Sequence, residues 1–137
     1  LCTGNSCRSQ MAEAFIRKYA EEIFEPFSAG LEPRPIHPMT LQVMDELGVN
    51  IRNQRSKSIS EFLGKTSLEF AIFVCERAEK NCPHIYPFVP NSLSWNFNDP
   101  ATALGTNDER LVVFREVRDQ IEKKILDWTK SISENQK

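Results

Sequence analysis

The first nine residues contain the residue types needed for nucleophilic chemistry on an anion. Cys2 is followed by Arg8 after five residues, and the residues between them are small or turn-prone: Thr3, Gly4, Asn5, Ser6 and Cys7. Gly4 and Asn5 tolerate a positive φ, so the loop can curl with its backbone N–H groups pointing inward. A loop of this kind that leads directly into a helix forms a site for an oxyanion.

The two ends of this loop supply the reactive groups. Arg8 can bind two oxygens of the anion with its guanidinium fork. Cys2 lies in the same positive field, which favours the thiolate form and makes it a nucleophile near neutral pH. Ser9 completes the predicted oxyanion site and can donate a hydrogen bond to that sulfur. The alternative is a pair of buried structural cysteines and a chance match, but the glycine, the asparagine and the helix that follows favour catalysis.

Residues 2–13 carry a resemblance to a known family. Their sequence, Cys-Thr-Gly-Asn-Ser-Cys-Arg-Ser-Gln-Met-Ala-Glu, resembles the anion loop of arsenate reductases built on the low-molecular-weight protein tyrosine phosphatase fold. The phosphatase branch more often has Ile before the second cysteine and Ser-Pro-Met after the arginine, so Ser6 and Gln10 favour the reductase branch.

The resemblance extends over nearly the whole chain and implies a fold. It predicts a single domain over residues 1–137, an α/β three-layer sandwich in which helices flank a four-stranded parallel sheet. In the family a central strand precedes the anion loop, whereas only Leu1 precedes Cys2 here. We therefore expect the first strand of the sheet to be missing from this sequence and to be supplied by upstream residues.

The order of the predicted elements also indicates an α/β fold. Helical patterns cover residues 9–23, 38–47, 58–63 and 108–128, strand patterns cover 25–29, 68–74 and 93–97, and 49–51 is extended. We expect Ser9 to cap the first helix, Glu13 to lie on its solvated face, and the polar tail 130–137 to fray. Either Ser58 or Ser60 is expected to cap the short helix at 58–63. The last helix is expected to bury an apolar stripe at helical spacing: Leu111, Phe114, Val117, Ile121, Ile125 and Trp128.

The strand at 68–74 places a second cysteine near the first. The strand is nearly continuous in apolar residues, which suits a parallel strand covered on both faces. Cys75 follows it directly. Because open α/β sheets bind ligands at the carboxyl ends of their strands, we expect Cys75 and Cys2 on the same rim.

Composition excludes several classes of partner. The chain has 137 residues and a net charge of −2, so no overall basic field attracts nucleic acid or an anionic membrane. No apolar stretch is long enough to span a bilayer. Four cysteines fit catalytic or redox use in a reducing compartment better than a secreted disulfide scaffold. We expect a cytoplasmic monomer.

A proline-dense loop over residues 32–38 is expected to form one wall of the site. Arg34 and His37 in this loop could contact a substrate or a partner. The simpler interpretation is that both are exposed loop residues without such a role.

The resemblance assigns an acid to the second half of the chain. In the family, an aspartate followed by proline protonates the leaving oxygen, and Asp99-Pro100 matches this pair. Trp95 and Phe97 would anchor its loop. Classical phosphatases commonly have adjacent tyrosines after the pair, and their absence here makes phosphotyrosine a less favoured substrate.

Cys75 and Cys82 are seven residues apart, as in the thioredoxin-coupled arsenate reductases. The residues between them can form two helical turns. Seven residues of α-helix rise roughly 10 Å, whereas a disulfide needs Cα atoms about 4.4–6.8 Å apart. If the two cysteines pair, this segment must therefore leave the helical conformation.

The resemblance implies a cascade of three thiols. Cys2 attacks bound arsenate, Cys75 then attacks Cys2 and releases arsenite, and Cys82 attacks Cys75 to free Cys2. No tightly bound cofactor is implied. An external dithiol, thioredoxin or glutaredoxin with glutathione, reduces the final disulfide. Slow phosphoester hydrolysis is a plausible side activity, since it needs only Cys2, Arg8 and Asp99.

Two other functions stay open. One is a low-molecular-weight protein tyrosine phosphatase that acts through a cysteinyl-phosphate, and the other is a non-catalytic oxyanion-binding redox module. A metal site formed by Cys75, Cys82 and His84 is disfavoured, because the spacing fits no usual zinc site and a fourth ligand is unassigned. We expect Cys7 to pack behind the loop, with a protective disulfide to Cys2 as the alternative.

Overall fold

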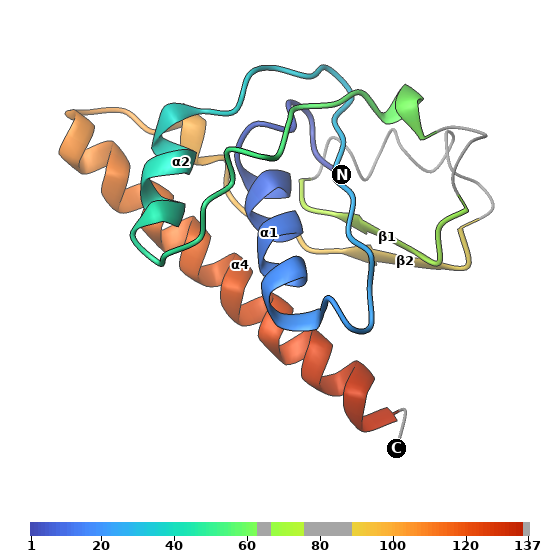
Figure 1. Ribbon diagram of the computed structural model, residues 1–137. Coiled ribbons are helices and arrows are strands. Elements are labelled where there is room, and N and C mark those ends of the chain that lie inside the picture. The colour runs from blue at the N-terminus through green and yellow to red at the C-terminus, as the bar shows by residue number, and fades with distance from the viewer. Residues whose placement is uncertain (63–66, 76–88, 136–137) are drawn as a thin grey trace.

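The computed structural model describes residues 1–62, 67–75 and 89–135 (Figure 1). Its helices and strands are α1 (Arg8–Ala20), α2 (Pro38–Asp45), η1 (Ile59–Glu61), β1 (Phe70–Phe73), β2 (Asn91–Ser94), η3 (Pro100–Thr102) and α4 (Asn107–Asn135). No helix in these three ranges has an apolar stretch that could cross a bilayer. The predicted helical turns at 76–82, together with Cys82 and His84, lie outside the described residues.

Parallel strands form the sheet, as predicted. β1 and β2 pair in parallel, with Phe70 opposite Asn91. On the other side of β1, the amino group of Leu1 donates to the carbonyl of Ile72 over 2.7 Å, and the N–H of Val74 donates to the carbonyl of Leu1 over 3.0 Å. The N-terminus therefore lies beside β1 (Figure 1).

Two isolated parallel bridges continue this arrangement away from β1. Cys2 pairs with Gly30, and Gly30 pairs with Ser58. Three chain segments that are far apart in the sequence thus meet beside the end of β1. The anion loop begins at this meeting point.

Helix α4 packs against α1, α2 and the sheet (Figure 1). The predicted apolar stripe of this helix is confirmed, since its side chains at helical spacing are buried: Leu111, Phe114, Val117, Ile121 and Ile125. Trp128 continues the stripe and packs edge-on against Phe70 of β1 and against Trp95. These contacts hold the first helix and the sheet together under the anion loop.

Several predicted boundaries were wrong for physical reasons. Residues 25–29 form no regular strand, because Pro26 has no N–H to donate and only Gly30 makes bridges. Residues 49–51, predicted only to be extended, lie outside every helix and strand and follow Gly48, which has a φ of +72°. β2 begins two residues before the predicted 93–97, and helix α4 continues to Asn135, so the tail predicted to fray is largely helical.

Two predictions about individual side chains were also wrong. Ser9 does not cap α1: the helix begins at Arg8, Cys7 takes the N-cap position, and no side chain caps the helix. Glu13 is not on a solvated face but is 6% exposed.

In β1, only Ala71 and Phe73 are buried while Phe70 and Ile72 are half-buried, so one face of the strand is covered less completely than expected. By contrast, Ser58, one of the two serines predicted to cap the short helix η1, does cap it.

Candidate active site

The loop from Cys2 to Ser9 curls around the sulfur of Cys2. Asn5 has a φ of 51°, so the predicted positive φ is found at this residue, and its N–H donates to Cys2 Sγ over 3.2 Å. Gly30 packs directly against the loop. A Cβ at position 30 would lie 2.7 Å from the carbonyl oxygen of Thr3 and 2.9 Å from the nitrogen of Asn5. The close approach of these two segments therefore requires glycine.

The predicted hydrogen bond between Ser9 and Cys2 is confirmed. Ser9 Oγ lies 2.8 Å from Cys2 Sγ, and Asn5 Nδ2 donates to Ser9 Oγ over 2.8 Å. An amide NH₂ can only donate, so Ser9 accepts from Asn5 and has its own hydroxyl hydrogen available for the sulfur. Cys2 is 3% exposed, which strengthens these interactions.

Three polar side chains outside the loop fix its carbonyl groups, and two of them were not identified from the sequence. Ser56 Oγ donates to the carbonyl of Gly4 over 3.2 Å, and Thr40 Oγ1 donates to that of Ser6 over 3.1 Å. Gln10 is fully buried and donates to the carbonyl of Asn5 over 3.0 Å. Only Gln10 had a signal in the sequence, through its position in the family pattern.

Arg8 and Asp99 lie together at the mouth of the loop. Arg8 Nη1 donates to the carbonyl of Phe97 over 3.0 Å, and its Nη2 lies 3.6 Å from Asp99 Oδ2. Asp99 Oδ1 accepts from the N–H of Ala101 over 3.0 Å and so caps η3. Trp95, which precedes this aspartate, belongs to the buried core, and half-buried Phe97 packs against that core.

Cys75 lies at the same rim as Cys2, at the carboxyl end of β1. Its Sγ is 3.6 Å from the Oγ1 of Thr3, the residue that follows Cys2. Cys75 is buried, as are Cys2 and Cys7. The structure therefore brings the first two predicted thiols to one site, while the third, Cys82, is outside the described residues.

Cys7 packs on the inner side of the loop. Burial raises the pKa of its thiol, and hydrogen bonds from Thr40 and Ser6 oppose this only in part. A thiol with a raised pKa stays protonated at neutral pH and is a poor nucleophile. The alternative disulfide between Cys7 and Cys2 is not formed.

The proline-dense loop contributes its backbone to the site. The N–H of Arg34 donates to the carbonyl of Gly4 over 2.9 Å, while the Arg34 side chain is exposed. His37 caps α2 by accepting from the N–H of Met39 over 3.1 Å, and its own N–H donates to the carbonyl of Ser6. Burial and then the charge of Arg110 lower the pKa of His37, so the ring is neutral at pH 7. Its position supports the loop.

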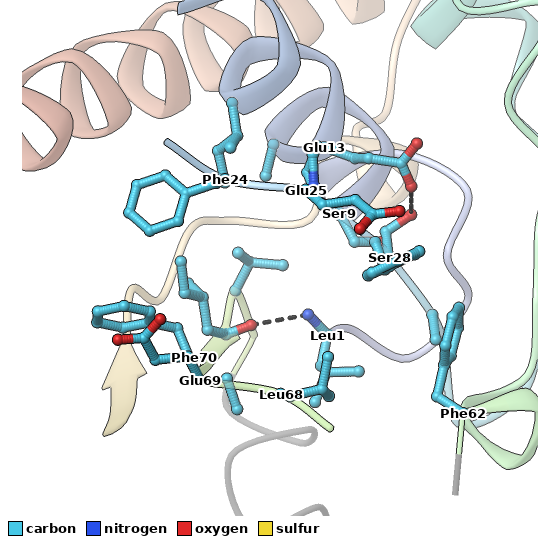
Figure 2. Close-up of a pocket in the computed structure, with 18 of the residues that line it drawn as sticks. Leu1, Ser9, Glu13, Phe24, Glu25, Ser28, Phe62, Leu68, Glu69 and Phe70 are labelled. Atoms are coloured by element: carbon cyan, nitrogen blue, oxygen red, sulfur yellow. Dashed lines mark hydrogen bonds between the residues drawn. The ribbon is translucent and has the colours of Figure 1, made fainter. Parts of the chain in front are cut away.

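A buried acidic side chain lies behind the loop, next to a cavity of about 330 Å³ lined by Leu1, Ser9 and Glu13 (Figure 2). Glu13 Oε1 accepts from Ser28 Oγ over 2.7 Å and lies 3.6 Å from Lys57 Nζ. Burial lowers the pKa of Lys57, and the charge of Glu13 opposes that change. Within the described part of the chain, no group of three or more His, Cys, Asp or Glu side chains could hold a metal ion.

Comparisons with known sequences place these features in a family. A sequence profile described as "Low molecular weight phosphotyrosine protein phosphatase" matches residues 1–137. The arsenate reductase of Halalkalibacterium halodurans is 43% identical over 126 residues, covering 91% of this chain and 88% of that protein. The arsenate reductase of Bacillus subtilis is 38% identical over 132 residues, covering 96% and 93%.

Solved structures agree. A structure described as an arsenate reductase in the phosphate binding state superposes with a TM-score of 0.76 at 30% identity, covering 96% of this chain and 94% of that one. Vibrio vulnificus Wzb in complex with benzylphosphonate gives a TM-score of 0.77 at 20% identity, covering 95% and 94%. At 20% identity, the similarity to Wzb shows a shared fold and nothing more. The predicted low-molecular-weight phosphatase-like α/β fold is confirmed.

Proposed function

This chain belongs to the low molecular weight phosphotyrosine protein phosphatase family, and we propose that it is an enzyme that reduces arsenate to arsenite. Relatives named arsenate reductase, at 43% and 38% identity over most of the chain, favour this substrate. The observation that carries the proposal is the thiol of Cys75 beside the anion loop, 3.6 Å from Thr3 Oγ1. A phosphatase needs only the first cysteine here, whereas a reductase needs a second thiol within reach of it.

Arsenate binds in the loop between Cys2 and Ser9. The loop N–H groups and Arg8 hold its oxygens, and the start of α1 adds positive potential. Arg8 is already oriented by the carbonyl of Phe97 through one of its five N–H groups. A relative at 30% identity, described as an arsenate reductase in the phosphate binding state, supports a tetrahedral oxyanion as ligand.

The first step forms a bond between Cys2 and arsenic. The Cys2 thiolate attacks arsenic, one arsenic–oxygen bond breaks, and Asp99 donates a proton so that the departing oxygen leaves as water. The hydroxyl of Ser9 and the N–H of Asn5 stabilise the negative charge on sulfur before the attack. The position of Asp99 at the mouth of the loop, 3.6 Å from Arg8, supports this role.

The second step reduces arsenic. Cys75, as a thiolate, attacks the sulfur of Cys2, and the sulfur–arsenic bond breaks with its electron pair retained on arsenic. Arsenic goes from the +5 to the +3 state and leaves as arsenite, while the two thiols become a disulfide. Cys82 then attacks Cys75, which frees Cys2 and leaves a disulfide between Cys75 and Cys82. An external dithiol, thioredoxin or glutaredoxin with glutathione, supplies two electrons to reduce it.

The same loop supports slow hydrolysis of phosphate monoesters. Cys2 forms a cysteinyl-phosphate, Asp99 protonates the leaving group, and water then releases phosphate. Cys75 and Cys82 take no part in this reaction, so it serves as an internal control for the integrity of the loop.

The test compares arsenite release by the wild type, Cys75→Ser and Cys82→Ser in the presence of thioredoxin and its reductase. Hydrolysis of p-nitrophenyl phosphate is measured on the same samples. We expect both variants to lose multiple turnover of arsenate and to keep the phosphatase activity. Equal arsenate turnover by all three proteins would exclude the cascade. Phosphatase activity without arsenate turnover in the wild type would favour the tyrosine phosphatase, and oxyanion binding without either activity would favour the non-catalytic module.

A further inference from the structure

We propose that Gln10 and Gln54 are positioning residues that stabilise the Cys2 thiolate through an oriented chain of hydrogen bonds beginning at exposed Arg17. The inference rests on the proposed role of Cys2 as nucleophile and adds residues that contact neither the sulfur nor the oxyanion. The chain runs through five side-chain hydrogen bonds, and in each the donor lies on the side away from the sulfur.

The inner links are oriented by a backbone group. Asn5 Oδ1 accepts from the N–H of Lys57 over 2.8 Å, so the amide oxygen of Asn5 must face Lys57. Its NH₂ group therefore faces Ser9 and donates to Ser9 Oγ over 2.8 Å. Ser9 in turn has its hydroxyl hydrogen available for Cys2 Sγ, also 2.8 Å away.

Backbone carbonyls orient the middle link in the same way. Gln10 Nε2 lies 3.0 Å from the carbonyl oxygens of both Asn5 and Arg55, so this end of the amide is the NH₂ group. The same nitrogen donates to Asn5 Oδ1 over 2.9 Å. Gln10 Oε1 then points the other way and accepts from Gln54 Nε2 over 2.8 Å.

The outer link ends on a positive charge. Gln54 Nε2 also donates to the backbone carbonyl of Gln10 over 3.1 Å, which fixes the orientation of its amide. Gln54 Oε1 accepts from Arg17 Nη1 over 2.9 Å. Arg17 is exposed and also pairs with Glu13. The cation is therefore connected to the sulfur by amide and hydroxyl dipoles that all point the same way.

Burial strengthens the hydrogen bonds of this chain and so increases their effect on the Cys2 sulfur. Asn5 and Gln10 are fully buried, and Ser9 is 2% exposed. In a medium of low dielectric constant, each donated hydrogen bond makes the next donor in the chain more positive. The final hydroxyl therefore donates more strongly to Cys2 when the outer amides are in place, which favours the thiolate over the thiol.

The other ionisable groups around the sulfur come from different elements. They are Arg8 on α1, Cys7 in the loop, Cys75 after β1 and Asp99 before η3, with Glu13 and Lys57 behind the loop. A substitution at Gln54 leaves all of them in the protein. A change in the thiolate fraction of that variant therefore reports on the hydrogen-bonded chain.

The experiment measures the rate of Cys2 alkylation by iodoacetamide as a function of pH, by mass spectrometry of the Cys2 peptide. In Gln54→Met, a side chain of similar length neither accepts from Arg17 nor donates to Gln10. We expect alkylation about threefold to fivefold slower on the acidic limb, a midpoint shifted to higher pH, and an unchanged plateau at high pH. Arg17→Gln keeps an N–H donor but removes the charge. For this variant we expect a smaller effect, with alkylation about twofold slower on the acidic limb.

The matched control is Arg52→Gln, which removes an exposed arginine that bonds to Asp45 and Asn50. Its pH profile should coincide with that of the wild type, and thermal unfolding checks that each variant is folded. A merely structural role for Gln54 predicts a lower melting temperature with an unchanged midpoint. An unchanged midpoint in both Gln54→Met and Arg17→Gln overturns the proposal. Absence of arsenate turnover in a wild type with reactive Cys2 overturns the proposed function instead.

Discussion

The two thiols at the rim of the sheet are held in different ways. Cys2 receives hydrogen bonds from Ser9 and from the N–H of Asn5, and a buried network fixes both donors. Cys75 follows a four-residue strand and contacts Thr3 over a longer distance of 3.6 Å. Under the proposed mechanism the difference has a reason. Cys2 must be held in one position as a thiolate before arsenate binds. Cys75 must approach Cys2 to form a disulfide with it and must then form a disulfide with Cys82.

A large effect is expected from disturbing the loop that holds Cys2. In Gly30→Ala, the new Cβ would meet the carbonyl of Thr3 at 2.7 Å, so the loop must shift. We expect the free energy of unfolding to fall by about 1–3 kcal/mol. Phosphate affinity, measured by calorimetry, should fall at least about tenfold, because the N–H groups leave their positions.

Gly48→Ala is the matched control for that variant. Gly48 has a φ of +72° and nothing within 4 Å of its added Cβ, so only backbone strain is introduced. This should cost about 1–2 kcal/mol of stability and leave phosphate affinity unchanged. Equal loss of affinity in both variants would mean that general destabilisation, and not the position of the loop, determines binding.

A smaller effect is expected at the Cys75 side of this comparison. Thr3→Val removes the hydroxyl beside Cys75 and keeps the shape of the side chain. We expect the ratio of arsenate turnover to p-nitrophenyl phosphate hydrolysis to fall about threefold, because a weak contact to sulfur contributes on the order of 0.5–1 kcal/mol. Thr3→Ser, which keeps the hydroxyl, should restore the ratio. A ratio that is the same in all three proteins would separate Thr3 from the second step.

The sequence predicted features whose cause is local. The loop from Cys2 to Arg8, the apolar stripe of α4 and the cap at Ser58 each depend on residue types within one or two turns of chain. The rim shared by Cys2 and Cys75 followed from a general property of parallel sheets.

Features that depend on distant partners were missed. Glu13 occupies a polar position in a helical pattern, and its burial results from Ser28 and Lys57, which approach from other segments. Ser9 has the residue type of a helix cap, but it lies inside α1, and its hydroxyl oxygen accepts from Asn5 Nδ2. The contact of Gln54 with Gln10 joins residues 44 positions apart, and no local pattern reports such a pair.

The most direct test of the thiol cascade is a single turnover in Cys82→Ser without any reductant. The protein is mixed with excess arsenate, and the amount of arsenite released per protein molecule is measured. Disulfides are identified by mass spectrometry of peptides. The account predicts one arsenite per protein and a disulfide that joins Cys2 to Cys75, because two thiols supply the two electrons. Arsenite released without that disulfide, or Cys2 joined to Cys7 instead, would contradict it.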